Sequence, residues 1–108
     1  MFVVIYEFVV KQGDEQQFIS AWSKTTQGIY LFKNSLGSRL HRDKRGVFIA
    51  YAQWPDEATY RNAVNIEMSA DYEQQREQMR NSLHLEATKV VYEMEVNVDY
   101  LQQQPIAL

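Results

Sequence analysis

The chain has 108 residues, of which 45% are apolar and 23% are charged, and its net charge is −3. This size and composition predict a single soluble globular domain. The negative charge argues against nucleic-acid binding, which requires clustered Lys and Arg. The sequence contains no cysteine, which excludes disulfides, thiol catalysis and cysteine-based metal sites.

The remaining composition makes a metal centre or a membrane span unexpected. Only His41 and His84 could supply imidazole ligands, and their spacing is not that of a metal site. No segment reaches the about 18 apolar residues that a membrane-spanning helix needs. The apolar N-terminus lacks the basic region and cleavage site of a signal peptide. We therefore expect no metal, no membrane association and a cytoplasmic location.

Hydrophobic periodicity predicts strands and helices along the whole chain. Asp14 and Gln17 form a capping-box pattern at the start of the first helix, which Gly28 weakens by about 1 kcal/mol. Residues 43–46 form a hairpin turn. The predicted elements are a strand over 2–10, a helix over 14–32, strands over 36–43 and 47–54, a short helix over 56–64, a helix over 70–84 and a strand over 87–98.

The element order β-α-β-β-α-β, with the second helix split in two, is that of a ferredoxin-like α+β fold. This fold has an antiparallel sheet with helices on one face. It predicts one domain over residues 1–98 and a C-terminal tail over 99–108. The polar segment Gln102–Pro105 in this tail could fray or reach across to a partner.

The first strand is apolar on both of its faces. Val3, Ile5 and Val9 alternate with the apolar residues of the opposite face. Helices cover only one face of such a sheet, and the other face would be polar if it were exposed to water. We therefore expect a homodimer in which the two sheets pack face to face as a dimeric α+β barrel.

Residues 51–61 bring two large aromatic side chains to one strand-to-helix junction. Trp54 ends a strand and Tyr60 follows on the next helix, beside the small strand residues Ala50 and Ala52. Small residues surrounded by aromatic ones predict a hollow that holds a ligand. The alternative interpretation is ordinary packing of aromatic side chains in the core.

Arg76 interrupts the apolar stripe formed by Tyr72, Met79 and Leu83 on the last helix. A guanidinium aimed at the core requires an anion or several acceptors, because burying an unpaired charge is costly. This pattern indicates a site for an anionic or phenolate-like ligand. The alternative is that Arg76 pairs with a glutamate (Glu7, Glu93 or Glu95) or extends into water.

The register of the predicted hairpin determines which face His41 occupies. Pairing Asp43 with Gly46 would place His41 opposite Phe48, on the same face as Trp54. A loop that differs by one residue would place His41 on the other face.

The run Tyr51-Ala-Gln-Trp-x-x-Glu-x-x-Tyr-Arg61, in this order of elements, resembles the antibiotic biosynthesis monooxygenase (ABM) family of dimeric α+β barrels. The resemblance covers about residues 2–98 and is greatest to the cofactorless, quinone-forming branch of the family. It implies oxygenation of a small aromatic phenol or quinol by O2 without flavin or metal, so no cofactor is expected. The substrate anion would itself supply the electron that activates oxygen.

The resemblance also implies a set of site residues. Trp54 and Tyr60 would hold the aromatic substrate and bind its oxygens, and Arg76 would stabilise the phenolate. A pocket Asn of the family falls on Ala50 here, which leaves binding possible and places catalysis in question. The haem-degrading branch is disfavoured, because its ligand positions match poorly. The expected substrate-binding residues are Tyr6, His41, Ala50, Ala52, Tyr72 and Met79.

Three functions thus remain open from the sequence. The first is a cofactor-independent monooxygenase, and the second is a non-catalytic dimer that binds or senses a small aromatic molecule. The third is a structural dimerisation module with a filled core, which predicts no cavity near Trp54.

Overall fold

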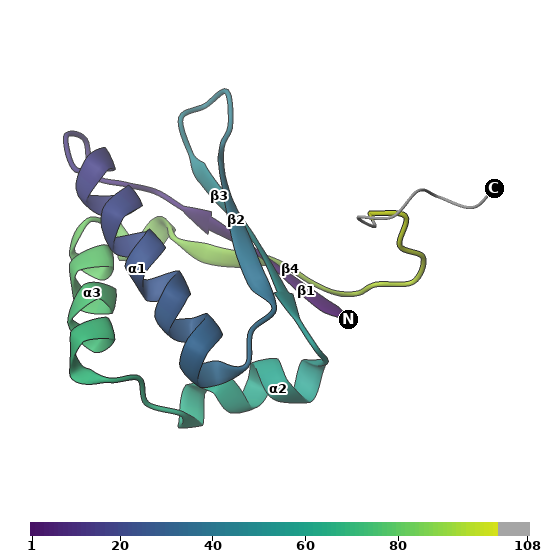
Figure 1. Cartoon of the computed structure of the whole chain (residues 1–108). Coiled ribbons are helices and arrows are strands. Elements are labelled where there is room, and N and C mark those ends of the chain that lie inside the picture. The colour runs from purple at the N-terminus through teal and green to yellow at the C-terminus, as the bar shows by residue number, and fades with distance from the viewer. Residues whose placement is uncertain (102–108) are drawn as a thin grey trace.

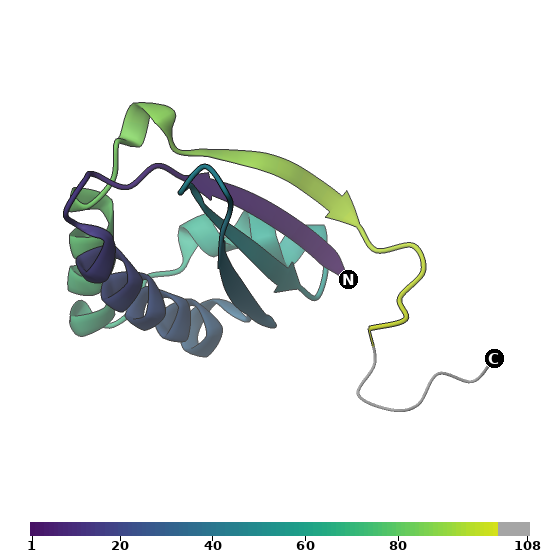
Figure 2. The ribbon, with the colours of Figure 1, turned by 90° about the horizontal axis from the view of Figure 1, so that it is seen from above.

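The computed structural model describes residues 1–101 (Figure 1). Within these residues, the strands form one antiparallel sheet in the order β2-β3-β1-β4, and the helices lie on one face of it (Figure 2). The ferredoxin-like α+β fold predicted from the sequence is confirmed. The elements are β1 (Phe2–Phe8), α1 (Glu15–Lys33), β2 (Gly37–Arg42), β3 (Phe48–Trp54), α2 (Glu57–Asn62), α3 (Ala70–Asn81) and β4 (Lys89–Glu95).

The ends of the helices differ from the prediction in two details. The capping box at α1 is not formed, because the side chain of Asp14 makes no capping hydrogen bond. The side chain of Gln17 instead donates to the carbonyl of Gln78 on α3. Helix α3 ends at Asn81, and Leu83 then pairs with Val10 in an isolated β-bridge. The predicted tail segment Gln102–Pro105 lies outside the described residues.

The hairpin between β2 and β3 is one residue longer than predicted. Asp43 pairs with Val47 through the Asp43 N to Val47 O hydrogen bond of 2.9 Å. The Asp43 carboxylate accepts hydrogen bonds from the backbone N–H groups of Arg45 and Val47, and Gly46 adopts φ +85°. This conformation favours glycine and closes a three-residue loop. His41 therefore lies opposite Ile49, not Phe48.

The core between the sheet and the helices is divided into two clusters. One cluster is centred on Phe8, Phe18 and Phe48, and the other on Phe2 and Trp54. Tyr6, in the middle of β1, packs against both clusters. Because this tyrosine lies between the two packed regions, the middle of the covered face is where space for a ligand can remain.

Helices α1 and α3 approach each other closely at Gly28. A Cβ atom at this position would lie 2.7 Å from Cγ of Tyr72 and 2.8 Å from the sulfur of Met68. Any larger residue would therefore force the two helices apart. The glycine that weakens α1 in isolation permits its contact with α3, and this contact closes the helical side of the domain.

The face of the sheet opposite the helices is apolar at its centre, as the sequence predicts, and carries the exposed Arg39 and His41 at its β2 edge. It carries Val3 and Ile5 from β1, Ile49 and Tyr51 from β3, and Tyr92 from β4. Tyr92 remains 59% exposed in the single chain. Across residues 1–101, the helices are too short or too polar to cross a membrane.

Candidate functional site

A cavity of about 540 Å³ lies between the helices and the covered face of the sheet. Its floor is formed by β1 and β3, where the small residues Ala50 and Ala52 leave the space open. Helices α1, α2 and α3 supply the walls. Cavities of this size hold small organic ligands. The structure therefore has a cavity beside Trp54 and not the filled core of the alternative interpretation.

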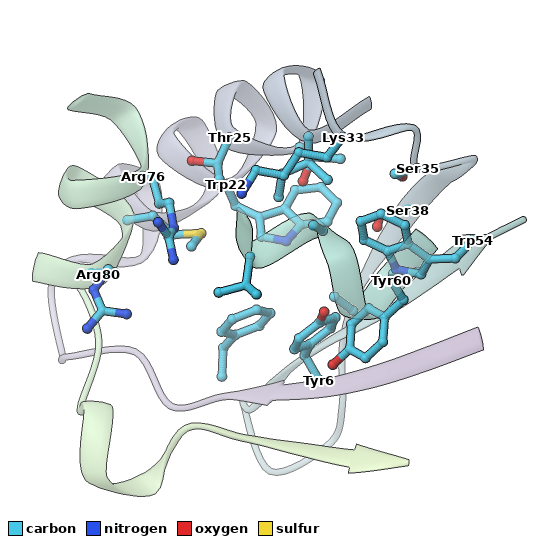
Figure 3. A pocket seen from close by; sticks show the side chains of 18 of the residues that line it. Tyr6, Trp22, Thr25, Lys33, Ser35, Ser38, Trp54, Tyr60, Arg76 and Arg80 are labelled. Carbon is cyan, nitrogen blue, oxygen red and sulfur yellow. The ribbon is translucent and has the colours of Figure 1, made fainter. Parts of the chain in front are cut away.

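One end of the cavity is aromatic. Trp54 is only 4% exposed, and its ring lies edge-on to that of Tyr60 with the centroids 5.6 Å apart. Phe2 also packs against Tyr60, with a centroid separation of 5.7 Å. The pair predicted from residues 51–61 therefore does form a single aromatic corner (Figure 3).

The indole N–H of Trp54 is a buried donor without a partner. Among the buried side-chain nitrogen and oxygen atoms of the described residues, the indole nitrogen of Trp54 alone has no hydrogen-bond partner. Leaving such a donor unsatisfied costs about 1–3 kcal/mol. Trp54 also lines the cavity, so this unsatisfied donor lies beside the space that a ligand would occupy.

Two tyrosine hydroxyls lie beside this corner. The hydroxyl of Tyr60 donates to Oε1 of Glu93 on β4, at 3.5 Å. The pKa of Tyr6 is raised far above its ordinary value, first by burial and then by the neighbouring Tyr60 and Glu93. Tyr6 therefore stays a neutral phenol at physiological pH, and it can donate a hydrogen bond but cannot act as a base.

Glu93 also ties the aromatic corner to α2. Its carboxylate pairs with the guanidinium of Arg61, which in turn pairs with Glu57 one helical turn away. The same guanidinium lies 5.1 Å from the centre of the Tyr60 ring. This arrangement holds α2, and with it Tyr60, against the edge of β4.

The opposite side of the cavity is charged. Arg76 projects from α3 toward the cavity, across from Trp54 and Tyr60 (Figure 3). Its side chain is 47% exposed and pairs with Glu73 at 3.7 Å. It pairs with none of the glutamates proposed from the sequence, because Glu7 pairs with Arg45 and Glu93 with Arg61. Arg76 lies at the cavity wall, partly in water, so extension into water, one of the alternatives left open by the sequence, is what its side chain does in part.

Of the expected site residues, seven line the cavity and two do not. Those that line it are Tyr6, Ala50, Ala52, Trp54, Tyr60, Arg76 and Met79. His41 lies on the opposite face of the sheet, where its ring contacts the carbonyl of Ile49 at 3.1 Å. Tyr72 packs between the helices against Gly28 and Phe32. His41 does not line the cavity because the longer hairpin loop places it on the other face of the sheet. Tyr72 does not line it because its ring fills the close contact between α1 and α3.

The sequence interpretation missed three further cationic residues that line the cavity, Lys33, Arg61 and Arg80. Lys33, in the last turn of α1, lines the cavity and is only 8% exposed. It follows Trp22 and Ile29, which also line the cavity, at helical spacing. A lysine at helical spacing from apolar residues is the same pattern that identified Arg76. The sequence alone could therefore have predicted Lys33 as a site residue. No cluster of residues able to hold a metal ion occurs within residues 1–101.

The fold is shared with solved structures of known oxygenases. No protein-family model and no curated protein matches the chain. SnoaB, a cofactor-independent oxygenase from Streptomyces nogalater, is 14% identical with a TM-score of 0.67, over 94% of this chain and 97% of that one. An antibiotic biosynthesis monooxygenase is 16% identical with a TM-score of 0.68, over 91% of this chain and 100% of that one.

Another neighbour has no named activity. A conserved protein from Methanosarcina mazei is 11% identical with a TM-score of 0.68, over 89% of this chain and 92% of that one. At these identities the likeness establishes the fold alone. The resemblance to the monooxygenase family seen in the sequence thus agrees with the three-dimensional structure of the domain, and the activity must be argued from the site itself.

Proposed function

We propose that this protein is a cofactor-independent monooxygenase that oxidises a small aromatic phenol or quinol with O2 in the cavity beneath the helices. The observation that carries the proposal is the unpartnered indole N–H of Trp54, a residue that lines an aromatic cavity of about 540 Å³. The corner formed with Tyr60 suits a planar ring. The shared fold with SnoaB, named a cofactor-independent oxygenase, supports this choice.

The proposed reaction balances without an added reductant. The phenolate transfers an electron to O2, and the two resulting radicals combine at a ring carbon. Loss of water then leaves a quinone. One oxygen atom enters the product and the other leaves as water, while the substrate supplies all four electrons. The protein needs only to bind the ring, favour its anion and keep solvent out.

The cavity favours the substrate anion by its charge. Its lining contains arginine, lysine and tyrosine but no carboxylate or imidazole, within the part of the chain that the structure describes. The described lining thus offers no carboxylate or imidazole as a general base. The cations lower the pKa of a bound phenol, and its proton passes to water.

The alternative function is a small-molecule binding or sensing dimer without catalysis. It is favoured by Ala50, which lines the cavity where the family carries an Asn. Without that amide, Trp54 and Tyr6 are the donors left at the aromatic end. In both functions we propose that the chain forms a homodimer through the open face of the sheet, because Tyr92 and Met94 leave exposed apolar surface there.

Oxygen consumption with a panel of anthrones and quinols tests the proposal, in buffer free of flavin and metal. We expect one O2 consumed per quinone formed, without release of hydrogen peroxide. Trp54→Phe removes the indole donor and keeps an aromatic ring, and Arg76→Ala removes a cation. Each is expected to lower kcat/KM by about 10-fold or more, the loss of one hydrogen bond or charge contact.

The control variant is Lys24→Gln, since Lys24 is exposed on α1 and does not line the cavity. Unchanged turnover in both Trp54→Phe and Arg76→Ala would contradict this site assignment. Binding of the ligands with thermal stabilisation but without oxygen consumption would establish the non-catalytic alternative.

A further inference from the structure

Lys33 is a nearly buried cation without an anion. It belongs to the last turn of α1 and is 8% exposed. Within residues 1–101, no carboxylate lies within ion-pair distance of its ammonium group. Burial of a charged group is costly unless it is paired. The Lys33 ammonium is accordingly not among the fully enclosed polar atoms of the described residues, and it meets the open cavity, where a ligand can reach it.

The side chain of Lys33 is directed into the cavity. It extends toward the wall formed by α3, where Arg76 also projects (Figure 3). A lysine in the last turn of a helix can instead stabilise the helix end through the helix dipole. For that role the ammonium group needs only to lie in water beside the last carbonyl groups of the helix. The role does not explain why the side chain is directed into the cavity.

The charges around Lys33 leave this end of the cavity positive. Arg76 lowers the pKa of Lys33 after burial does, and Glu73 opposes this shift. Glu73 is shared with Arg76, its partner at 3.7 Å. Arg80, one turn further along α3, also lines the cavity beside Arg76 (Figure 3). Three cations and one carboxylate thus leave this end of the cavity with an excess of about two positive charges, which favours an anionic group on the ligand.

We propose that the substrate carries a carboxylate, held between Lys33 and Arg76, at the end of the cavity opposite Trp54. This inference rests on the proposed function and adds the substrate class, an aromatic carboxylic acid. The oxidised ring would occupy the corner of Trp54 and Tyr60, and the carboxylate would fix which ring carbon faces that corner. Lys33 is then a specificity-determining residue.

The test compares two non-reacting probes that differ only in charge, anthraquinone-2-carboxylate and anthraquinone-2-carboxamide. Trp22 and Trp54 both line the cavity, so quenching of their fluorescence reports binding, and calorimetry confirms the affinity. We expect the wild type to bind the carboxylate about 10-fold more tightly or better, as for a charge-assisted contact of about 1.4 kcal/mol.

Lys33→Gln should reduce this preference to about 2-fold or less and leave the affinity for the carboxamide unchanged. Lys33→Arg should restore the preference, because it restores the cation. Lys24→Gln, on the exposed side of the same helix, should behave as the wild type. Thermal melts of each variant establish that the domain is folded.

Three outcomes would overturn the inference. One is a wild type that binds both probes equally, and another is a Lys33→Gln variant that loses affinity for both probes to the same extent. In either case the oxygenase proposal survives, since neutral quinols can still be oxidised. Failure of both probes to bind would contradict the proposed aromatic pocket, and the carboxylate subsite with it.

Discussion

The two faces of the sheet contain similar apolar residues but differ in what covers them. On the covered face, Phe48 and Trp54 are almost completely buried beneath the helices. On the open face, Tyr92 is 59% and Met94 41% exposed. The covered face leaves a cavity of about 540 Å³. The open face presents an apolar surface that a second copy would cover in the proposed dimer.

This difference arises from the elements that close each face. Helices α1 and α3 contact each other tightly at Gly28, but small residues below them, Ala50 and Ala52, leave the middle of the sheet uncovered by side chains. Two flat sheets can pack with their side chains interdigitated and leave little space. The comparison teaches that the ligand site depends on a helical layer that bridges the sheet without filling it.

The largest expected effect is on the covered face. Trp54→Ala removes a buried aromatic side chain from one core cluster and should lower the free energy of unfolding by about 3–5 kcal/mol. Urea denaturation measures this loss, which should not depend on protein concentration. Tyr30→Ala serves as the control, because Tyr30 is 57% exposed and should change stability by about 0.5 kcal/mol or less. Equal losses in both variants would contradict the core position of Trp54.

A charge on the open face should break the proposed dimer. Tyr92→Asp places a carboxylate twice in a two-fold interface and should raise the dimer dissociation constant by about 10-fold or more, since a buried unpaired charge is costly. Sedimentation velocity over a dilution series measures this constant. Lys24→Asp, on the helical side, should leave it unchanged. A wild type that sediments as a monomer at all concentrations would remove the proposed role of the open face.

The smallest effect concerns the N-cap that holds α2 at the edge of the covered face. The carboxylate of Asp56 accepts hydrogen bonds from the N–H and hydroxyl of Thr59, both at 2.7 Å, and these bonds lower its pKa. This stabilisation is complete above the unfolded pKa, about 3.9, and is lost as the pH falls through the lower pKa of the folded state.

Asp56→Ala should therefore have a lower melting temperature than the wild type at pH 7, and the difference should disappear in strong acid. Asp56→Asn should retain the cap at both pH values, since Asn also caps helices well. A difference between Asp56→Ala and the wild type that persists unchanged in acid would show that the carboxylate is not the capping group.

Much of the fold follows from local patterns in the sequence. The alternation in β3 indicates correctly that Ala50, Ala52 and Trp54 share a face, and the helical spacing places Arg76 and Met79 toward the cavity. These predictions succeed because each depends on neighbours within one element. The prediction for His41 was wrong because the hydrogen bonds of Asp43 add one residue to the hairpin loop, and one residue reverses the face.

The sequence by itself determined the order of the elements, the apolar character of both sheet faces and the meeting of Trp54 with Tyr60. All of these depend on residues close together in the chain. Only the tertiary structure decided that the space beside Trp54 is a cavity, that its indole N–H lacks a partner, and that Lys33 shares this cavity with Arg76. These features depend on how closely α1, α3 and the sheet approach one another. Contacts between residues that are distant in the sequence determine that approach.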